Sequence, residues 1–548
     1  MKESLPAIVF PILRVLTNFD CAMHKYIILP AIALFALTAC EPTERTNPEA
    51  LKEIERRAAA TAAAAAAAAQ AEQQRAAIAV EAPAPVNYAT SLLDIRTNAQ
   101  GFNLLRPWEK SAPETRVVSG VYLGNGMVLT VGQAAKAATY VEIALPDDSR
   151  AVPGKVLRYD EDLNLALITV AHTQDASIFE SRTPVQPASP MKLGDKADVW
   201  CTVKGLVPVQ VPLLVESGGA GNRMPRLVMK VSQPLPSSSW GGLPIIRDGR
   251  LVAISEGYQP QTQQLSAINA EFINRFLTSS AEGHVASAPV LGIRVEELDS
   301  PIFRSYLKLD EKQGGMYISR VEPGSPAEEA GIRKGDVLVA IEDLPLDNRG
   351  RCNHPLYGVT DSMLITRSYK TLGEKLRLSL SRNGEILHVD TPLNRDFVEK
   401  GLFREDKIGK QPRYVVWGGL LFQPLTTTYL DELHGKASSL PLEFLELKDR
   451  TKELRDKGYE ELVGMTLVIP TAATQDYESL GFCMVEAVNG NRARNFTEFV
   501  ALLEAPTANG ITEVSLNKPP YKIYLDRQLV EQCNDALRRN AIPRLKAE

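Results

Sequence analysis

The sequence predicts a mainly β protein of several domains. At 548 residues the chain exceeds what one hydrophobic core normally supports, so more than one folded unit is expected. Beyond about residue 101, short β-branched runs alternate with turn residues, which is typical of barrels and sandwiches built from many short strands. The formal net charge of -5 is small for this length and no long basic run stands out, which argues against nucleic acid as a partner.

The N-terminus predicts export and lipidation. Met23-His24-Lys25 gives a short basic start, and the apolar run over 26–36 has signal-peptide length and is too short to favour a spanning helix. Leu37-Thr38-Ala39-Cys40 resembles the lipobox of bacterial lipoproteins, which implies that Cys40 is lipidated. An ordinary secretory peptide with a chance cysteine is the alternative. We therefore expect residues 1–39 to be a signal peptide starting at Met23, and the protein to be anchored in a bacterial envelope, facing the periplasm, in the inner or the outer membrane.

An alanine-rich segment follows over residues 49–80, with an unbroken alanine run at 62–69. Alanine is the best helix former, so the segment is predicted to be a helical spacer between the membrane and the folded part. A disordered tether is the alternative and would serve the same purpose. Cys40 and this tether together occupy residues 40–100.

Residues 101–278 carry repeated strand and turn signals. Gly124-Asn125-Gly126 between two β-branched runs predicts one hairpin, and Arg247-Asp248-Gly249-Arg250 predicts a second. A polar Ala/Ser-rich stretch at 278–288 is the expected linker to the next domain. Further strands are expected at 151–158, 165–170, 197–204 and 226–232.

Read in order, these strands resemble the HtrA/Deg branch of the trypsin-like serine proteases over roughly 103–277, which implies a double β-barrel. In that family the catalytic histidine follows a strand ending in Leu-Thr, the aspartate opens an Asp-Ile-Ala-Leu run, and the nucleophile lies in Gly-Asn-Ser-Gly-Gly. The matching positions of this chain are Gln133, Asn164 and Trp240. Trp240 stands within Ser238-Ser239-Trp240-Gly241-Gly242.

Each replacement removes one chemical capability. Gln133 has no nitrogen that titrates near neutral pH, so it cannot accept and return a proton. Asn164 lacks the negative charge that stabilises an imidazolium, and Trp240 offers an indole N–H but no nucleophile. Ser238 also replaces the glycine whose backbone helps to form the oxyanion hole. The sequence thus predicts a catalytically degenerate barrel, a pseudoprotease and not an enzyme.

An active serine endopeptidase with a rearranged site near Ser239 is the alternative. Such a nucleophile needs a base, and the only histidine of this region is His172, which the resemblance places away from the nucleophile. Lys136 is the remaining candidate and is interpreted as a solvated surface residue.

No cofactor and no metal site are predicted. The cysteines after Cys40 are too widely spaced for a metal-ligand pattern or a disulfide framework. Cys483 and Cys533 fall in one predicted domain, where pairing and non-pairing both stay open. The full set is Cys201, Cys352, Cys483 and Cys533.

The segment 324–341 resembles the core signature of bacterial-type PDZ domains, which we assign to residues 288–396. In it Ser325 caps a short helix begun by Pro326, and Gly331 ends that helix. The resemblance implies that backbone N–H groups around Gly292 receive a peptide C-terminus. It also implies that the strand beginning at Ile293 pairs with the peptide, and that a later helix supplies an apolar pocket. The peptide-binding residues predicted in this way are Leu291, Gly292, Ile293, Val295 and Leu364; a plain core role is the alternative for Leu291, Ile293 and Leu364.

The last unit, residues 397–548, resembles the second, divergent PDZ domain of the plant and fungal Deg branch at 414–426 and 481–490. It lacks the Gly-Ser-Pro-Ala segment, so we expect it to pack against its neighbours. The predicted function is that of a membrane-anchored periplasmic adaptor or chaperone-like scaffold in envelope protein quality control, which binds peptide C-termini or unfolded segments. The resemblance further implies a homo-oligomer, a trimer or a multiple of one.

Overall fold

The computed structural model describes residues 87–203, 207–221, 223–236, 240–279, 282–436, 446–447 and 450–548, and positions 56, 59, 60 and 63 before them. The predicted signal peptide, Cys40, most of the alanine-rich segment and Ser237 to Ser239 lie outside the described residues. The chain divides into two units, Met1–Pro85 and Val86–Glu548, and the fold below belongs to the second. None of the helices in the described ranges has both the length and the apolar character needed to cross a membrane.

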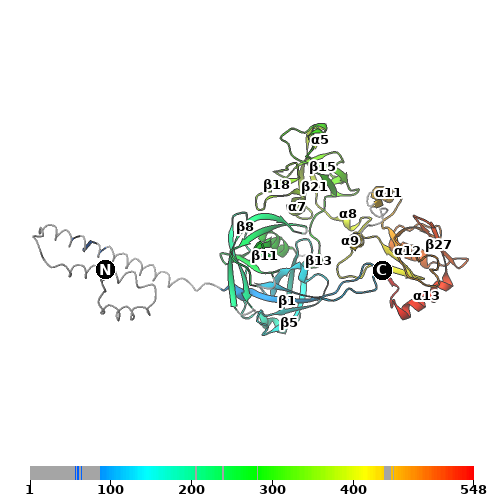
Figure 1. Cartoon of the computed structure of the whole chain (residues 1–548), viewed down its shortest axis with the longest axis horizontal. Helices are drawn as coiled ribbons and strands as arrows, with labels where there is room; N and C mark the ends of the chain where they lie inside the picture. Colours follow the sequence, from blue (N-terminus) through cyan, green and yellow to red (C-terminus); the bar gives the residue numbers. More distant parts are fainter. Residues whose placement is uncertain are drawn as a thin grey trace, which may run out of the picture. The chain divides into compact units, whose positions relative to one another are not determined.

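The first barrel is built from six strands, and its ribbon is drawn in blue to cyan in Figure 1. The pairing order is β5-β4-β1-β2-β3-β6, and direct pairing of β5 with β6 closes the ring. A seventh strand, β13 (Gly283–Val285), adds in parallel to the outside of β5. The barrel strands are β1 (Leu92–Ala99), β2 (Glu114–Gly124), β3 (Met127–Val131), β4 (Ala138–Ala144), β5 (Ala151–Asp160) and β6 (Leu165–Val170).

A second closed barrel has the order β10-β11-β12-β9-β8-β7 and is followed by helix α4 (Ala270–Thr278). Both hairpins predicted from turn residues are present, between β2 and β3 and between β10 and β11. Asp248 and Gly249 both have positive φ, +51° and +76°, as a tight two-residue turn requires. The strands are β7 (Lys196–Val203), β8 (Val207–Ala220), β9 (Pro225–Val231), β10 (Pro244–Arg247), β11 (Arg250–Gln259) and β12 (Gln264–Asn269).

A five-stranded sheet, β14-β15-β16-β20-β21, follows the barrels, with the short β17 (Leu344–Pro345) on β16. Ser325 Oγ accepts a hydrogen bond from the Glu328 N–H at 3.3 Å, and Pro326 opens α6, as the sequence predicts. The main strands are β14 (Ile293–Glu296), β15 (Met316–Val321), β16 (Val337–Ile341), β20 (Lys375–Arg382) and β21 (Glu385–Pro392). The hairpin and helices are β18 (Arg351–His354), β19 (Gly358–Asp361), α5 (Pro301–Tyr306), α6 (Pro326–Glu329) and α7 (Ser362–Ser368).

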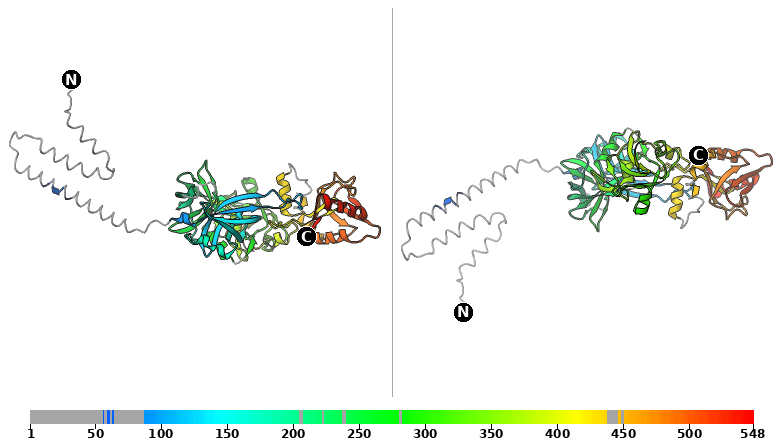
Figure 2. Two further views of the ribbon diagram at one scale, coloured as in Figure 1. Left: turned by 90° about the horizontal axis from the view of Figure 1, so that it is seen from below. Right: turned by 90° about the horizontal axis from the view of Figure 1, so that it is seen from above.

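The C-terminal part is a seven-stranded sheet, β27-β26-β25-β24-β23-β22-β28. Figure 2 shows it in orange and red. Cys483 and Cys533 share its core, and all four cysteines of the described ranges carry thiols. The strands are β22 (Tyr414–Trp417), β23 (Leu420–Pro424), β24 (Val463–Val468), β25 (Cys483–Val488), β26 (Ile511–Leu516), β27 (Lys522–Asp526) and β28 (Lys546–Ala547). The helices are α8 (Asp396–Glu399), α9 (Thr427–Lys436), α11 (Thr451–Asp456), α12 (Phe496–Glu504) and α13 (Arg527–Asn540).

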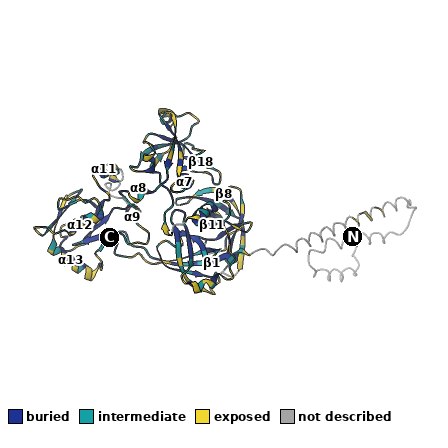
Figure 3. Cartoon of the chain, turned by 180° about the vertical axis from the view of Figure 1, so that it is seen from behind, coloured by how far each residue is buried: buried dark blue, intermediate teal, exposed yellow. Residues whose placement is uncertain are grey.

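Tyr357 is one of the residues through which the domain after the barrels packs on the second barrel, together with Arg275 of α4, which donates to the Ser368 carbonyl at 2.7 Å. Tyr357, in the β18–β19 turn, is only 1% exposed and packs into the barrel core. Its hydroxyl donates to Glu271 Oε1 on α4 at 2.5 Å, and burial raises the pKa of both groups. A Cβ on Gly218 of β8 would lie 2.3 Å from the Tyr357 carbonyl oxygen. The hairpin therefore approaches β8 so closely that only glycine fits at this position. Figure 3 shows how the buried residues gather along the barrel strands.

Candidate functional site

The Trp240-Gly241-Gly242 segment lies between the two barrels and is bound to both. The Gly241 carbonyl accepts from the Ser119 N–H of β2 at 2.8 Å, and the Gly242 N–H donates to the Ser255 carbonyl of β11 at 2.8 Å. Gly242 has φ +87°, and a Cβ there would lie 1.8 Å from the Ser119 oxygen. Only glycine fits this position, because a side chain would collide with backbone. The Gly-Gly pair that the sequence aligns with the protease motif is therefore held in one place.

Gln133 and Asn164 meet at the mouth of the first barrel. Gln133 lies in the short helix η3 (Gly132–Ala134) after β3, and its side chain is exposed. Its backbone N–H donates to Asn164 Oδ1 at 3.1 Å, and the Gly132 N–H donates to the Asn164 carbonyl at 2.8 Å. The two positions are thus connected by hydrogen bonds from the backbone N–H groups of Gly132 and Gln133 to the carbonyl and side-chain amide oxygens of Asn164. In the described geometry the Gln133 side chain takes no part in that contact.

The other end of the Asn164 amide is bound by an ion pair of the second barrel. Asn164 Nδ2 donates to Glu256 Oε1 at 2.6 Å, and Glu256 pairs with Arg226 at 2.8 Å. Arg226 is 1% exposed, so the pair is largely withdrawn from water. Burial alone would raise the pKa of Glu256, but the charge and hydrogen bonds of Arg226 and the Asn164 amide hold it below its usual value. Asn164 is therefore a neutral donor to a carboxylate, the opposite of the role that an aspartate plays beside a histidine.

Trp240 acts as a packing residue. Its ring lies edge-on to Tyr258, with centroids 5.4 Å apart and planes at 70°, and it joins the core of the second barrel. Its carbonyl accepts from Ser255 Oγ at 2.5 Å. Within the described part of the chain, no group accepts from its indole Nε1.

The alternative nucleophile Ser239 and the oxyanion position Ser238 lie outside the described residues. Their candidate bases are described. His172 precedes the short helix η4 (Thr173–Phe179), beyond the end of β6 that is remote from Asn164. A six-residue strand spans roughly 20 Å, which separates His172 from this centre. Lys136 is an exposed residue.

Replacing Asn164 with aspartate is expected to destabilise the protein by about 2 kcal/mol at pH 8, because two carboxylates would then face each other. One of the two folded-state pKa values would rise above its unfolded value, so the penalty should be full at high pH and fade as the pH falls towards 5. Thermal unfolding of wild type and Asn164→Asp at both pH values measures this. The matched control is Asn125→Asp, also at positive φ (+52°) but in an exposed hairpin turn. An equal shift in both variants would contradict the contact with Glu256.

The second candidate site is the open edge of the sheet at β14. This strand pairs with β15 on one side, and it ends the strand order of its sheet. The Glu322 N–H donates to the Gly292 carbonyl at 2.8 Å, and Ile293 lies opposite Val321. This register directs the peptide groups of Ile293 to the unpaired edge. An extended peptide can therefore add there as a further strand.

The loop before β14 is fixed from behind. Leu291 is buried in the core of this sheet, and its carbonyl accepts from the Ala327 N–H at 3.1 Å. Gly292 has φ +76°, and a Cβ there would lie 2.3 Å from Ser325 Cβ. Among the described residues, none accepts a hydrogen bond from the Leu291 or Gly292 N–H. These donors suit a carboxylate.

The remaining predicted residues lie on both sides of the proposed groove. Ile293 and Val295 of β14 are half-buried against the sheet core. Leu364 is half-buried on α7, a helix that packs on β16 and β19 and also touches β9 of the second barrel.

Sequence reasoning did not find Glu256 and Arg226. One signal was present: Arg226 begins a predicted strand whose other members alternate between buried and solvated positions. A buried arginine requires a carboxylate partner, but only the folded barrels show which one.

Two closed six-stranded barrels with this interface, followed by sheets of the kind described, define a trypsin-like double barrel with PDZ domains. Family models support the PDZ assignment. One PDZ domain model matches residues 403–548, and another matches residues 317–350. The mainly β fold predicted from the sequence is thus confirmed.

Several named proteins are similar to this chain in sequence. "Protease Do-like 2, chloroplastic" of Arabidopsis thaliana is 24% identical over 412 residues, 73% of this chain and 65% of that protein. "Periplasmic pH-dependent serine endoprotease DegQ" of Escherichia coli (strain K12) is 22% identical over 297 residues, 53% of this chain. The matches span 65% of the first relative and 61% of the second, less than two thirds of either protein. The chain is similar to HtrA/Deg-type trypsin-like serine proteases with PDZ domains.

A solved structure titled "HtrA-type protease AlgW with decapeptide" also resembles this chain, at 16% identity and a TM-score of 0.40. The similarity covers 56% of this chain and 97% of that one.

Proposed function

We propose that this protein is a pseudoprotease that binds peptide C-termini or unfolded segments through its first PDZ domain, as an adaptor or chaperone-like scaffold. The observation that carries the proposal is the bond from Asn164 to the Glu256–Arg226 pair. This bond supports a structural role for Asn164, the residue at the position of the triad's acid, because it joins the two barrels. Gln133 and Trp240 are consistent with it, since neither can replace a histidine or a serine.

Purified protein is expected to leave fluorogenic casein uncleaved, and Ser239→Ala is expected to change nothing. A working triad accelerates hydrolysis by roughly a million-fold over its knockout, so even a weak active site would be visible. An active HtrA/Deg-type protease serves as the positive control. Turnover that disappears in Ser239→Ala would favour the alternative, an endopeptidase with a rearranged site.

Peptide binding is tested by titrating C-terminal decapeptides against the full chain. Gly292→Glu is a poor probe by itself, because any side chain there strikes Ser325 and strains the loop. Leu364→Asp is cleaner, since Leu364 is half-buried on α7 and outside the domain core. We expect at least tenfold weaker binding from a charge in the apolar pocket. Unchanged affinity in Leu364→Asp would remove α7 from the groove.

We further propose that Cys40 is lipidated and holds the protein at the bacterial envelope, facing the periplasm, and that the chain forms trimers or multiples of trimers. The lipobox-like Leu37-Thr38-Ala39-Cys40 and the similarity to HtrA/Deg-type proteases support these two proposals. Detergent partitioning of wild type against Cys40→Ser tests the anchor, and light scattering of the tether-free part tests the oligomer.

A further inference from the structure

Four parts of the chain meet at a cavity of about 390 Å³ beside the first PDZ domain. The barrels, the PDZ domain, the connecting segment and the last domain each contribute one arginine to its wall. These residues are Arg223, Arg367, Arg395 and Arg455.

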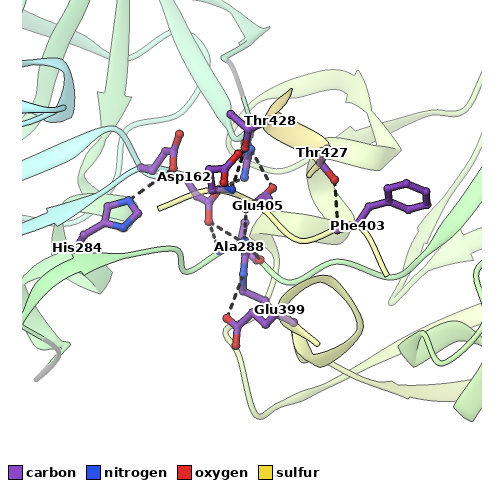
Figure 4. Close-up of polar contacts among 12 residues, drawn as sticks. Asp162, His284, Ala288, Glu399, Phe403, Glu405, Thr427 and Thr428 are labelled. Carbon is purple, nitrogen blue, oxygen red and sulfur yellow. Dashed lines mark hydrogen bonds and ion pairs between the residues drawn. The ribbon is translucent and has the colours of Figure 1, made fainter. Parts of the chain in front are cut away.

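Two of the arginines lie beside carboxylates, those of the buried Asp162 and the exposed Glu405, which Figure 4 labels. Asp162, a buried carboxylate from the first barrel, accepts from Arg223 at 2.8 Å and from Arg395 at 3.3 Å. Glu405 lies 3.5 Å from Arg223 and 3.3 Å from Arg395. Arg395 is 5% exposed, and its Nε finds no hydrogen-bond acceptor among the described residues, the Glu399 carboxylate being 3.8 Å away.

The other two arginines have no carboxylate partner in the described ranges. Arg367 lies in the last turn of α7, where Arg223 repels its charge, while the carboxylates of Asp162 and Asp361 attract it without forming an ion pair with it in the described ranges. Arg455 donates only to the Pro323 carbonyl, at 3.0 Å. Glu322, the other acid of the wall, is engaged by Arg320 at 2.9 Å. Two positive charges are therefore left over at the cavity, which suits an occupant with one or two negative charges.

Two threonines, Thr427 and Thr451, and otherwise apolar residues complete the wall, which adjoins the loop before β14. Val290, which lines the cavity, immediately precedes Leu291 and Gly292. Phe397 lines the cavity too, and its ring tip lies 3.2 Å from where a Gly292 Cβ would stand. The remaining apolar side chains are Pro289, Pro323, Val398, Leu402 and Phe403. A bare inorganic anion leaves such a wall unmatched, whereas an apolar group that ends in a carboxylate fits both features.

We infer that this cavity receives the carboxylate end of the peptide bound at β14, with Arg367 as the residue that reads it and Arg455 as a second donor. The inference rests on the proposed peptide binding. It adds that recognition is shared by four parts of the chain, so that the barrels and the last domain both help to hold the peptide end that the PDZ domain captures.

Fluorescence anisotropy with the full chain tests this. The probe is a labelled decapeptide mixture whose last three positions are drawn from Ala, Val, Leu, Ile and Phe, made as free acid and as C-terminal amide. Wild type should prefer the acid about tenfold, Arg367→Gln should bind both forms alike, and Arg367→Lys should keep most of the preference. Arg333→Gln, which removes an exposed charge of the same domain, is the matched control and should behave as wild type.

Each negative result of this experiment contradicts a different part of the proposal. If wild type binds neither form, the proposed function falls and this inference with it. If wild type binds the acid and Arg367→Gln keeps the full preference while folded by thermal denaturation, peptide binding stands and the cavity is excluded. Acetate is the third probe. If acetate raises the unfolding temperature of wild type but not of Arg367→Gln, and does not lower the affinity for the peptide, the cavity binds a free anion and the inference is overturned.

Discussion

Replacing Asp162 with alanine is expected to lower stability by about 3–5 kcal/mol, the largest effect of any single charge removal in the described part of the chain. The carboxylate accepts from Arg223, from Arg395 and from the Ala288 N–H at 2.8 Å. Its loss would leave the buried Arg395 and the half-buried Arg223 without their shared buried counter-charge. The cost should exceed that of the missing bonds, because uncompensated buried charge is itself unfavourable.

Scanning calorimetry of the full chain measures the effect as a fall of about 10 °C in the first unfolding transition. Asp148→Asn is the control, since Asp148 also pairs with an arginine of the first barrel but its side chain is 71% exposed, and asparagine tolerates the positive φ (+59°) of this position. An exposed pair contributes roughly 1 kcal/mol or less, so this control should barely move. Equal shifts in the two variants would show that the Asp162 contacts do not hold the domains together.

Replacing Gly242 with alanine is expected to cost about 3 kcal/mol or more, through strain at positive φ and a collision with backbone. The Ser119 carbonyl oxygen would stand 1.8 Å from the new Cβ, and both strands involved belong to closed barrels that resist shifting. Gly257→Ala, in β11 of the same barrel, is the matched control, because nothing lies within 4 Å of its Cβ position and its φ is ordinary.

Calorimetry again provides the readout, with casein turnover measured alongside. Under the proposed function, the loss of stability is expected without any change in casein turnover, because the Gly-Gly pair packs between the barrels. If Gly242→Ala were as stable as Gly257→Ala, the tight geometry of this segment would be wrong.

Local rules account for the parts of the fold that were predicted correctly. The Asp248-Gly249 turn, the Ser325 cap and the glycine at 331 follow from preferences that act within four residues. At Gly242 the motif seen in the sequence agrees with the geometry, because φ is +87° and a backbone oxygen lies 1.8 Å from its Cβ position, which leaves no other residue type.

The contacts that join distant segments were not readable. Arg395 and Asp162 are 233 positions apart, and Asn164 and Glu256 are 92 apart. No periodicity relates such residues, and each also has a plausible solvated role. The sequence could show that Asn164 is not an acid, but it could not show what the amide binds.

What the sequence determined by itself is therefore chemical identity and local form: which residues stand where the resemblance places the triad, where turns and caps fall, and which segment resembles a peptide-binding domain. The tertiary structure alone decided that Asn164 donates to a buried ion pair, that Trp240 packs against a barrel core, and that two arginines without a carboxylate partner among the described residues converge beside the β14 loop. The physical reason is that charge pairing and close packing depend on distance in space, which the closing of two barrels and the docking of Tyr357 set.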